Sequence, residues 1–213
     1  MAIHYRTQGV FLKKNDRGEA DQLFTIYTKD FGKLGILGKA IRKIKSKLRG
    51  GAELFYLSEI EFIQGKIHKT LTDAILIENF SNIRKDLKKL KIAYQIVEVL
   101  DNLVAKEEKD EKAWQLLKEA LEKLNSLKKM PTVHTQEIIY YYFFWNLISI
   151  LGYQPEFHNC SLLGKKINCD IIKILKVILK KDWQILSRLK FEPSHQKLFK
   201  NISEWYRMKV YEE

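Results

Sequence analysis

The sequence predicts an α+β chain with an N-terminal five-stranded β-barrel followed by an all-α domain, because the spacing of apolar residues changes near residue 80. Residues 1–80 hold short segments that are rich in β-branched and aromatic residues or alternate between apolar and polar ones, as strands do. After Phe80, apolar residues recur at the three- and four-residue intervals of a helix. We therefore expect a barrel domain over 1–80 and a helical domain over 81–213.

The five expected strands follow one another at short spacing, with one long connection after the third. They are GVFLKK (9–14), QLFTIYT (22–28), KLGILGKA (33–40), ELFYLSEIEFIQG (53–65) and HKTLTDAILIENF (68–80). Gln64-Gly65-Lys66 is the expected hairpin turn between the last two strands. Five strands at this spacing favour a small closed barrel over a sandwich.

The helical domain begins with two amphipathic segments, 84–104 and 110–129. The second has an acidic first turn and a basic last turn, which suits the helix dipole. The apolar run IIYYYFFWNLISIL (138–151) is shorter than the roughly 20 residues of a membrane span, so it predicts a buried core helix. A loop is expected over 153–169, and further helices near 170–180, 182–190 and 194–211.

The chain is strongly basic, with 38 Lys and Arg against 26 Asp and Glu and a net charge of +12. Such a balance favours a polyanionic partner, nucleic acid before an acidic membrane surface. The alternative is a general abundance of lysine in the source organism. The N-terminal residues contain no apolar run of signal-peptide length, and two cysteines are too few for a disulfide scaffold. We therefore expect a cytoplasmic protein with reduced cysteines.

The densest cluster of cations is GKAIRKIKSKLRGG (38–51), which has no acid and follows the third expected strand. Lysine and arginine on such a connection would neutralise phosphates with little sequence preference. The candidate DNA-binding residues are Lys33, Lys39, Arg42, Lys43, Lys45, Lys47 and Arg49. Bases could stack on exposed rings, for which Phe24, Tyr27, Phe31 and Tyr5 are candidates. The alternatives are a solvated loop and rings that fill the barrel core.

A second basic stretch lies within 165–200, where cations alternate with Ile and Leu at helical spacing. It predicts a second surface for DNA or for an acidic peptide, and its candidate residues are Lys173, Lys176, Lys180 and Lys181. The alternative is an amphipathic helix pair with a lysine-rich outer face.

No catalytic constellation is found, so we expect a protein that is not an enzyme. Glu59 and Glu61 share one face of an expected strand, where they are more simply its solvated side than an acid–base pair. His158, Cys160 and Cys169 are the only metal-like group, but a structural zinc site needs four ligands and usually a close cysteine pair. Leu163 stands where the partner of Cys160 would be, so no zinc or other cofactor is expected.

Residues 16–55 contain a spaced pattern formed by Gly18, Glu19, Asp21, Thr28, Gly32, Lys33, Gly38, Ser46, Leu48 and Gly50. This pattern resembles that of the RecO family of bacterial recombination mediators. In this pattern Gly38, Ser46, Leu48 and Gly50 form the frame of the basic segment, with Leu48 facing inward. The motif LGYQPEF (151–157) also resembles the one that precedes the zinc-finger region of the family, in which many members carry four cysteines.

The resemblance implies an OB-fold domain, a helical domain, and binding of single- and double-stranded DNA. It also implies annealing of complementary strands and assistance to recombinase loading on strands coated by single-strand-binding protein. The implied partners are RecR and the acidic C-terminal tail of the coating protein, and the recombinase would be an indirect partner. The protein would be cytoplasmic and associated with the nucleoid, and it would not bind a membrane. The alternatives are a non-catalytic protein-interaction scaffold and an OB-fold RNA-binding protein.

Overall fold

The computed structural model describes residues 3–127, 134–158, 161–162, 165–186, 188 and 193–212. The chain divides into two compact units. The first comprises Met1–Lys85 with Leu100–Gln115, and the second comprises Asp86–Val99 with Leu116–Glu213. Residues 100–115 therefore pack with the N-terminal unit, although they lie beyond the expected strands.

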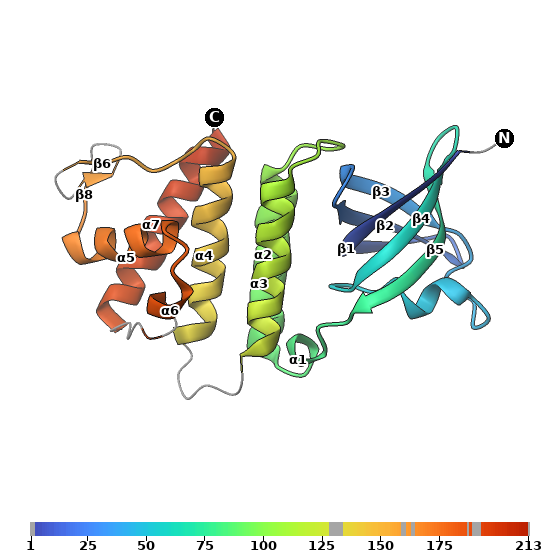
Figure 1. Cartoon of the computed structure of the whole chain (residues 1–213), viewed down its shortest axis with the longest axis horizontal. Coiled ribbons are helices and arrows are strands. Elements are labelled where there is room, and N and C mark those ends of the chain that lie inside the picture. Colours follow the sequence, from blue (N-terminus) through green and yellow to red (C-terminus); the bar gives the residue numbers. More distant parts are fainter. Residues whose placement is uncertain are drawn as a thin grey trace. The chain divides into compact units, whose positions relative to one another are not determined.

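The N-terminal unit is a closed barrel of five strands in the order β1-β2-β3-β5-β4 (Figure 1). Neighbouring strands are antiparallel except β3 and β5, which are parallel. This arrangement is that of an OB-fold and confirms the predicted barrel. The strands are β1 (His4–Arg17), β2 (Asp21–Thr28), β3 (Gly32–Gly38), β4 (Leu57–Gln64) and β5 (Lys69–Glu78).

The long strand β1 closes the barrel because its two halves pair with different neighbours. His4–Val10 pairs with β4, and Gly9–Arg17 pairs with β2, with a bulge between Phe11 and Lys13. Inward-facing side chains from all five strands form one apolar core, whose buried members include Phe11, Phe24, Ile26, Ile36, Ile60, Phe62 and Leu71. Their burial is the main force that stabilises the barrel.

Residues 100–110 comprise the end of α2 (Leu87–Leu103) and the connection to α3 (Glu111–Ser126), and they lie against the β2–β3 turn. Thr28 shapes this turn, because its hydroxyl donates to the carbonyl of Gly32 at 2.8 Å and accepts from the N–H of Phe31 at 3.1 Å. Gly32 has a φ of +63°, and a Cβ there would lie 2.0 Å from the backbone oxygen of Glu108. Only glycine allows this close approach.

The second unit is helical and is built around α4 (His134–Ile150), whose apolar side chains are almost all buried. The burial of α4 confirms the predicted core helix. In Figure 1, α5 (Cys169–Leu179) and α7 (Pro193–Glu212) pack beside α4. Two further helices are short: α1 (Ser81–Arg84) and α6 (Trp183–Leu186). Over the described residues, no helix is both long enough and apolar enough to cross a membrane.

Buried polar groups of α4 find partners within this unit. The indole N–H of Trp145 donates to the hydroxyl of Ser203 at 3.1 Å. The amide of Asn146 donates to the carbonyls of Tyr142 and Ile178 at 2.8 and 3.1 Å. These bonds explain how polar side chains are tolerated in this largely buried helix.

The segment expected as a loop over 153–169 instead contains a small antiparallel sheet in the order β6-β7-β8. Its strands are β6 (Phe157–His158), β7 (Ser161–Leu162) and β8 (Lys165–Lys166). Two-residue strands show no alternation in a sequence, which is why sequence patterns did not predict them.

Candidate nucleic-acid interface

The basic segment forms the connection between β3 and β4, as predicted. We call residues 39–49 the basic loop; it includes the start of a 3-10 helix, η1 (Lys47–Gly50). Leu48 packs against the barrel core, which confirms its inward position. The following Gly51 passes so close to β5 that a Cβ would lie 2.0 Å from the carbonyl oxygen of Ala74, and its own carbonyl accepts the hydroxyl of Ser58 at 2.6 Å.

The start of the basic loop is tied to the β1–β2 turn. The carboxylate of Asp21 accepts from the N–H of Ala40 at 2.7 Å, and the N–H of Arg42 donates to the carbonyl of Ala20 at 2.9 Å. The buried side chain of Ile41 lies between these two bonds in sequence and joins the core. The loop is therefore anchored by backbone and apolar contacts, and its cations are not needed to hold it.

All six cations of the basic loop are exposed: Lys39, Arg42, Lys43, Lys45, Lys47 and Arg49. Arg42 forms an ion pair with Asp16 at 3.3 Å, on the neighbouring turn. Ile44, between the lysines, is exposed as well. The structure thus brings six of the seven predicted DNA-binding residues onto one solvent-facing connection.

A cleft of about 230 Å³ lies between the basic loop and the first two strands. It is lined by Arg42, Arg49 and Lys14, with Glu53 at its edge. Lys14 is bound to Glu53 at 2.6 Å. Burial alone would raise the pKa of Glu53, but hydrogen bonds from Lys14 and the Leu54 N–H hold it below its ordinary value, so the carboxylate stays charged. Three cations against one acid suit the cleft to an anion such as a phosphate.

Lys33, the seventh predicted DNA-binding residue, is a correction. Its side chain is buried, with 7% of the residue exposed, and its ammonium group donates to the carbonyl of Asp101. The Asp101 carboxylate lies 3.2 Å from Lys33 and 2.5 Å from Lys13. Lys33 therefore attaches residues 100–110 to the barrel and has no free charge for DNA. Sequence spacing could not show this, because its partner is 68 residues away.

Two of the predicted stacking rings are also corrections. Phe24 and Tyr27 have no exposed surface, because Phe24 fills the barrel core and Tyr27 packs near Trp114. Burial raises the pKa of Tyr27 above its ordinary value, and the negative charges of Asp110 and Glu108 raise it by smaller amounts. Neither ring can present a face to a base. Phe31 remains partly exposed on the β2–β3 turn, and so does Tyr5 on β1.

The four lysines of the second predicted basic surface lie on α5 or just after it. Lys173, Lys176, Lys180 and Lys181 are all exposed, and the first three follow helical spacing on one side of α5. Lys173 is bound to Asp170 at 2.9 Å, and the ammonium of Lys176 lies 6.0 Å from the centre of the Phe157 ring. Their role in binding stays a prediction.

The metal-like group of the sequence falls largely outside the described part of the chain. Cys160 is not among the described residues, and neither is the side chain of His158. Cys169 is disulfide-bonded, so the expectation of a reduced thiol is wrong there. Oxidation depends on which sulfurs meet in the fold, and sequence spacing does not show that. Among the described residues, no three His, Cys, Asp or Glu side chains form a group that could hold a metal ion.

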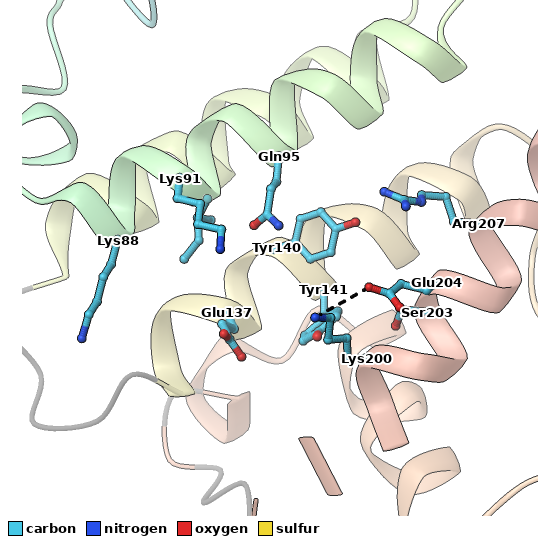
Figure 2. Close-up of a pocket in the computed structure, with 11 residues that line it drawn as sticks. Lys88, Lys91, Gln95, Glu137, Tyr140, Tyr141, Lys200, Ser203, Glu204 and Arg207 are labelled. Carbon is cyan, nitrogen blue, oxygen red and sulfur yellow. Dashed lines mark ion pairs between the residues drawn. The ribbon is translucent and has the colours of Figure 1, made fainter. Parts of the chain in front are cut away.

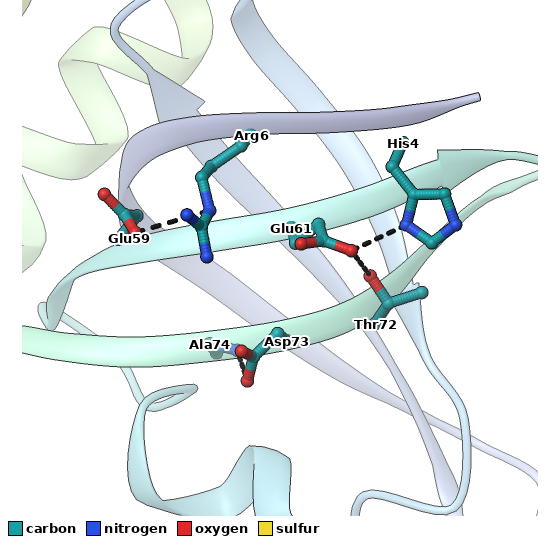
Figure 3. Close-up of polar contacts among 7 residues, drawn as sticks. All are labelled: His4, Arg6, Glu59, Glu61, Thr72, Asp73 and Ala74. Carbon is teal, nitrogen blue, oxygen red and sulfur yellow. Dashed lines mark hydrogen bonds and ion pairs between the residues drawn. The ribbon is translucent and has the colours of Figure 1, made fainter.

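Glu59 and Glu61 lie on the solvated face of β4, where each has a basic neighbour (Figure 3). Glu61 accepts from the Nδ1 of His4 at 2.6 Å, and Glu59 lies 3.4 Å from the guanidinium of Arg6. The bond from His4 holds the pKa of Glu61 below its ordinary value. Each carboxylate therefore has its own basic partner on the outer face of the strand, as expected for a solvated side rather than for an acid–base pair.

The helical unit has a pocket of its own, about 260 Å³ in volume, which sequence reasoning did not find. We call it the helical pocket. Figure 2 shows side chains of α2, α4 and α7 around it, with Tyr140 near its centre. The basic residues that line it are Lys88, Lys91, Lys200 and Arg207, against the acids Glu137 and Glu204. Because the lining comes from three helices far apart in sequence, no local pattern could have predicted it.

Two family models match the chain. Recombination protein O N terminal covers residues 1–80, and Recombination protein O C terminal covers residues 84–172. This chain belongs to the RecO family. Four residues of the matching pattern have structural roles: Asp21 and Thr28 each hold a turn, Gly32 allows the close approach of Glu108, and Leu48 packs on the core. These residues of the pattern shape the scaffold of the barrel.

The chain is also similar in sequence to curated RecO proteins. The chain is 32% identical to DNA repair protein RecO of Caldanaerobacter subterraneus subsp. tengcongensis over 163 residues, which is 76% of this chain and 64% of that protein. It is also 32% identical to DNA repair protein RecO of Dehalococcoides mccartyi strain CBDB1 over 167 residues, 78% of this chain and 64% of the relative. The match spans less than two thirds of the length of these relatives.

Proposed function

We propose that the barrel binds DNA through the basic loop and that the protein acts in DNA repair and recombination. The observation that carries this proposal is the set of six exposed cations on one connection that is anchored independently of them. Such a surface releases counterions from phosphates and binds with little sequence preference. Arg49, which also lines the adjoining cleft beside the ion-paired Lys14 and Arg42, would hold one phosphate there more closely. The names of the curated relatives support the role in repair.

Binding through phosphates also suggests what the protein does with two strands. Neutralising their charge lowers the repulsion between complementary strands, so the same surface would promote annealing. Following the RecO family, we propose that the protein works with RecR and helps a recombinase to load on strands coated by single-strand-binding protein. This role needs no catalytic group and no metal ion.

Charge reversal within the basic loop tests the binding surface. A variant with Lys45→Glu, Lys47→Glu and Arg49→Glu should bind single- and double-stranded oligomers at least tenfold more weakly in fluorescence anisotropy, because three neutralised phosphates become repelled ones. The matched control reverses three exposed lysines outside both predicted basic surfaces, Lys66, Lys85 and Lys112, and changes the net charge equally. Equal loss in both variants would show a general charge effect and would remove the basic loop from the proposal.

Strand annealing tests the proposed activity. Complementary oligomers, one with a donor and one with an acceptor dye, should anneal faster with the protein than without it, both bare and coated with single-strand-binding protein. The loop variant should lose this acceleration, and the control variant should keep it. Binding without any acceleration would restrict the protein to DNA binding.

The helical pocket supports the proposed contact with the acidic tail of the coating protein. Its lining carries four cations against two acids around the ring of Tyr140, and this excess of positive charge beside an aromatic ring suits an acidic peptide that ends in an apolar residue. Titration of the full chain with an acidic peptide ending in Phe should give saturable binding that weakens with salt. Lys91→Glu should reduce it, whereas Lys112→Glu, outside the pocket, should not. Equal effects would place the peptide elsewhere.

RNA binding is the remaining alternative for an OB-fold with a basic surface. The proposal predicts similar affinities for DNA and RNA oligomers of one sequence at one salt concentration, because phosphate contacts do not distinguish the two. A marked preference for RNA would indicate contacts to the 2′-hydroxyl and would favour the alternative.

A further inference from the structure

The barrel has a second cleft, at the opposite end of β3 from the basic loop. It lies where the β2–β3 turn and the β4–β5 hairpin meet, and its volume is about 270 Å³. Pockets for drug-sized ligands are usually about 300 Å³ or larger, so this cleft suits one small ring system rather than a length of polymer. The DNA-binding proposal above does not use it.

Three aromatic rings from separate elements form the wall of this cleft. Tyr5 of β1 stacks on Phe62 of β4 with ring centres 5.3 Å apart and planes 18° apart. Phe31 of the β2–β3 turn meets both rings edge-on, at 5.7 Å from Tyr5 and 5.6 Å from Phe62. Phe62 is buried, whereas Tyr5 and Phe31 are partly exposed. The accessible aromatic surface therefore belongs to Tyr5 and Phe31.

The rim of the cleft is polar but its charges are balanced. Lys69 is bound to Glu107 at 2.6 Å, and Lys109 lies 3.8 Å from Asp30. Asp30 is further held by the hydroxyl of Thr7 at 2.7 Å. Two cations paired with two acids give no net attraction for phosphate, unlike the basic loop.

Gln64, at the end of β4, adds a neutral hydrogen-bonding group to this cleft. Its amide nitrogen donates to the carbonyl of Gly65 at 3.1 Å, and its side chain is exposed. The amide oxygen can accept a further bond. A flat, uncharged ring with polar edges could stack on the aromatic side chains and hydrogen-bond to the amide of Gln64. The balanced charges of the rim suit such a neutral ligand.

We propose that this cleft, the base pocket, holds one unstacked nucleobase of a single strand, against the rings of Tyr5 and Phe31. The proposal rests on the DNA-binding function proposed above and adds a second site to it. A base inside a duplex is stacked and paired, so only single strands, gaps or ends could fill the pocket. The basic loop would then supply affinity for any phosphate backbone, and the base pocket would supply the preference for single strands.

An abasic strand separates the two sites experimentally, since it keeps the phosphates and lacks the bases. In fluorescence anisotropy, the full-length protein should bind labelled oligo(dT) about 5- to 150-fold more tightly than an abasic strand of equal length, the range expected for stacking of one base. Tyr5→Leu and Phe31→Leu should each reduce this ratio, and leave affinity for the abasic strand and for duplex unchanged. Tyr5→Phe, which keeps the ring, should preserve it.

Tyr211→Leu is the matched control, because this ring is 43% exposed and lies in the helical unit. Tyr5 and Phe31 both pack on the barrel core, so a reduced ratio counts only for a variant whose melting temperature matches that of the wild type. The wild-type ratio between oligo(dT) and the abasic strand decides in every case. Equal wild-type affinity for both strands would overturn the base pocket. Failure of the basic loop is distinguishable, since reversal of its cations would then leave abasic-strand affinity unchanged.

Discussion

The cluster of Lys13, Lys33 and Asp101 gives a quantitative test of how residues 100–110 are attached to the barrel. The carboxylate of Asp101 forms ion pairs with Lys13 at 2.5 Å and with Lys33 at 3.2 Å, and only 19% of the Asp101 side chain is exposed. Asp101→Asn keeps the shape of the side chain and removes its charge. The ammonium of Lys33, with 9% of its side chain exposed, would then face only a backbone carbonyl.

Removing one partner of a buried ion pair costs about 3–5 kcal/mol. Lys13 is nearly half exposed and Lys33 keeps its carbonyl partner, so we expect a lower value, about 2–3 kcal/mol of unfolding free energy. In a chain of this size, that loss lowers the melting temperature by about 4–12 °C. Urea denaturation of the full chain measures the free energy directly.

The same substitution has a defined pH dependence. Burial alone would raise the pKa of Asp101, but hydrogen bonds from Lys13 and Lys33 hold it below its ordinary value of 3.8. The carboxylate therefore stabilises the fold above pH 3.8, and this contribution is lost as the pH falls through the lower pKa of the folded state. The difference between wild type and Asp101→Asn should be full at pH 7 and shrink below pH 3.8.

Glu59→Gln is the control, because its ion pair with Arg6 at 3.4 Å is largely exposed. We expect a change of about 1 kcal/mol or less for this variant. If Asp101→Asn changes stability no more than this control does, the lysine cluster does not hold residues 100–110 in place.

Three further changes test other parts of the fold. Gly32→Ala should lower the unfolding free energy by about 2 kcal/mol or more in urea denaturation, because the left-handed backbone is strained by a side chain and the added methyl meets Glu108; an unchanged midpoint would refute the close approach. Ser203→Ala should cost about 1–3 kcal/mol by leaving the buried indole of Trp145 without its partner, and a neutral result would mean that another group takes the bond. Asp21→Ala should weaken DNA binding a few-fold in anisotropy without lowering the charge of the basic loop, since it releases the first anchored N–H of that loop; unchanged affinity would show that the anchor is not needed.

The sequence predicted those parts of the fold that repeat locally. The five strands and the larger helices follow from alternation and helical spacing, and the basic loop lies between β3 and β4 as expected. Six of the seven cations chosen as DNA-binding candidates are exposed, as is usual for lysine and arginine on a long connection, and their contact with DNA stays a prediction.

Features that depend on distant partners could not be predicted in this way. Lys33 looks like its basic neighbours in sequence, and only the position of Asp101 removes it from the surface. Phe24 and Phe31 are both rings of the same barrel, but one points into the core and the other lies at its edge. The helical pocket assembles side chains from three helices and has no local signal.

The salt dependence of single-strand binding tests the central claim most directly, because its slope reports how many phosphates the protein neutralises. Five cations, leaving out Arg42 with its partner Asp16, predict a slope of log affinity against log salt of about −3.5, or a loss of about 100-fold between 50 and 200 mM salt. A variant with Lys45→Gln, Lys47→Gln and Arg49→Gln should reduce the slope to about −1.4. An unchanged slope in this variant would contradict the claim that the basic loop binds the DNA backbone.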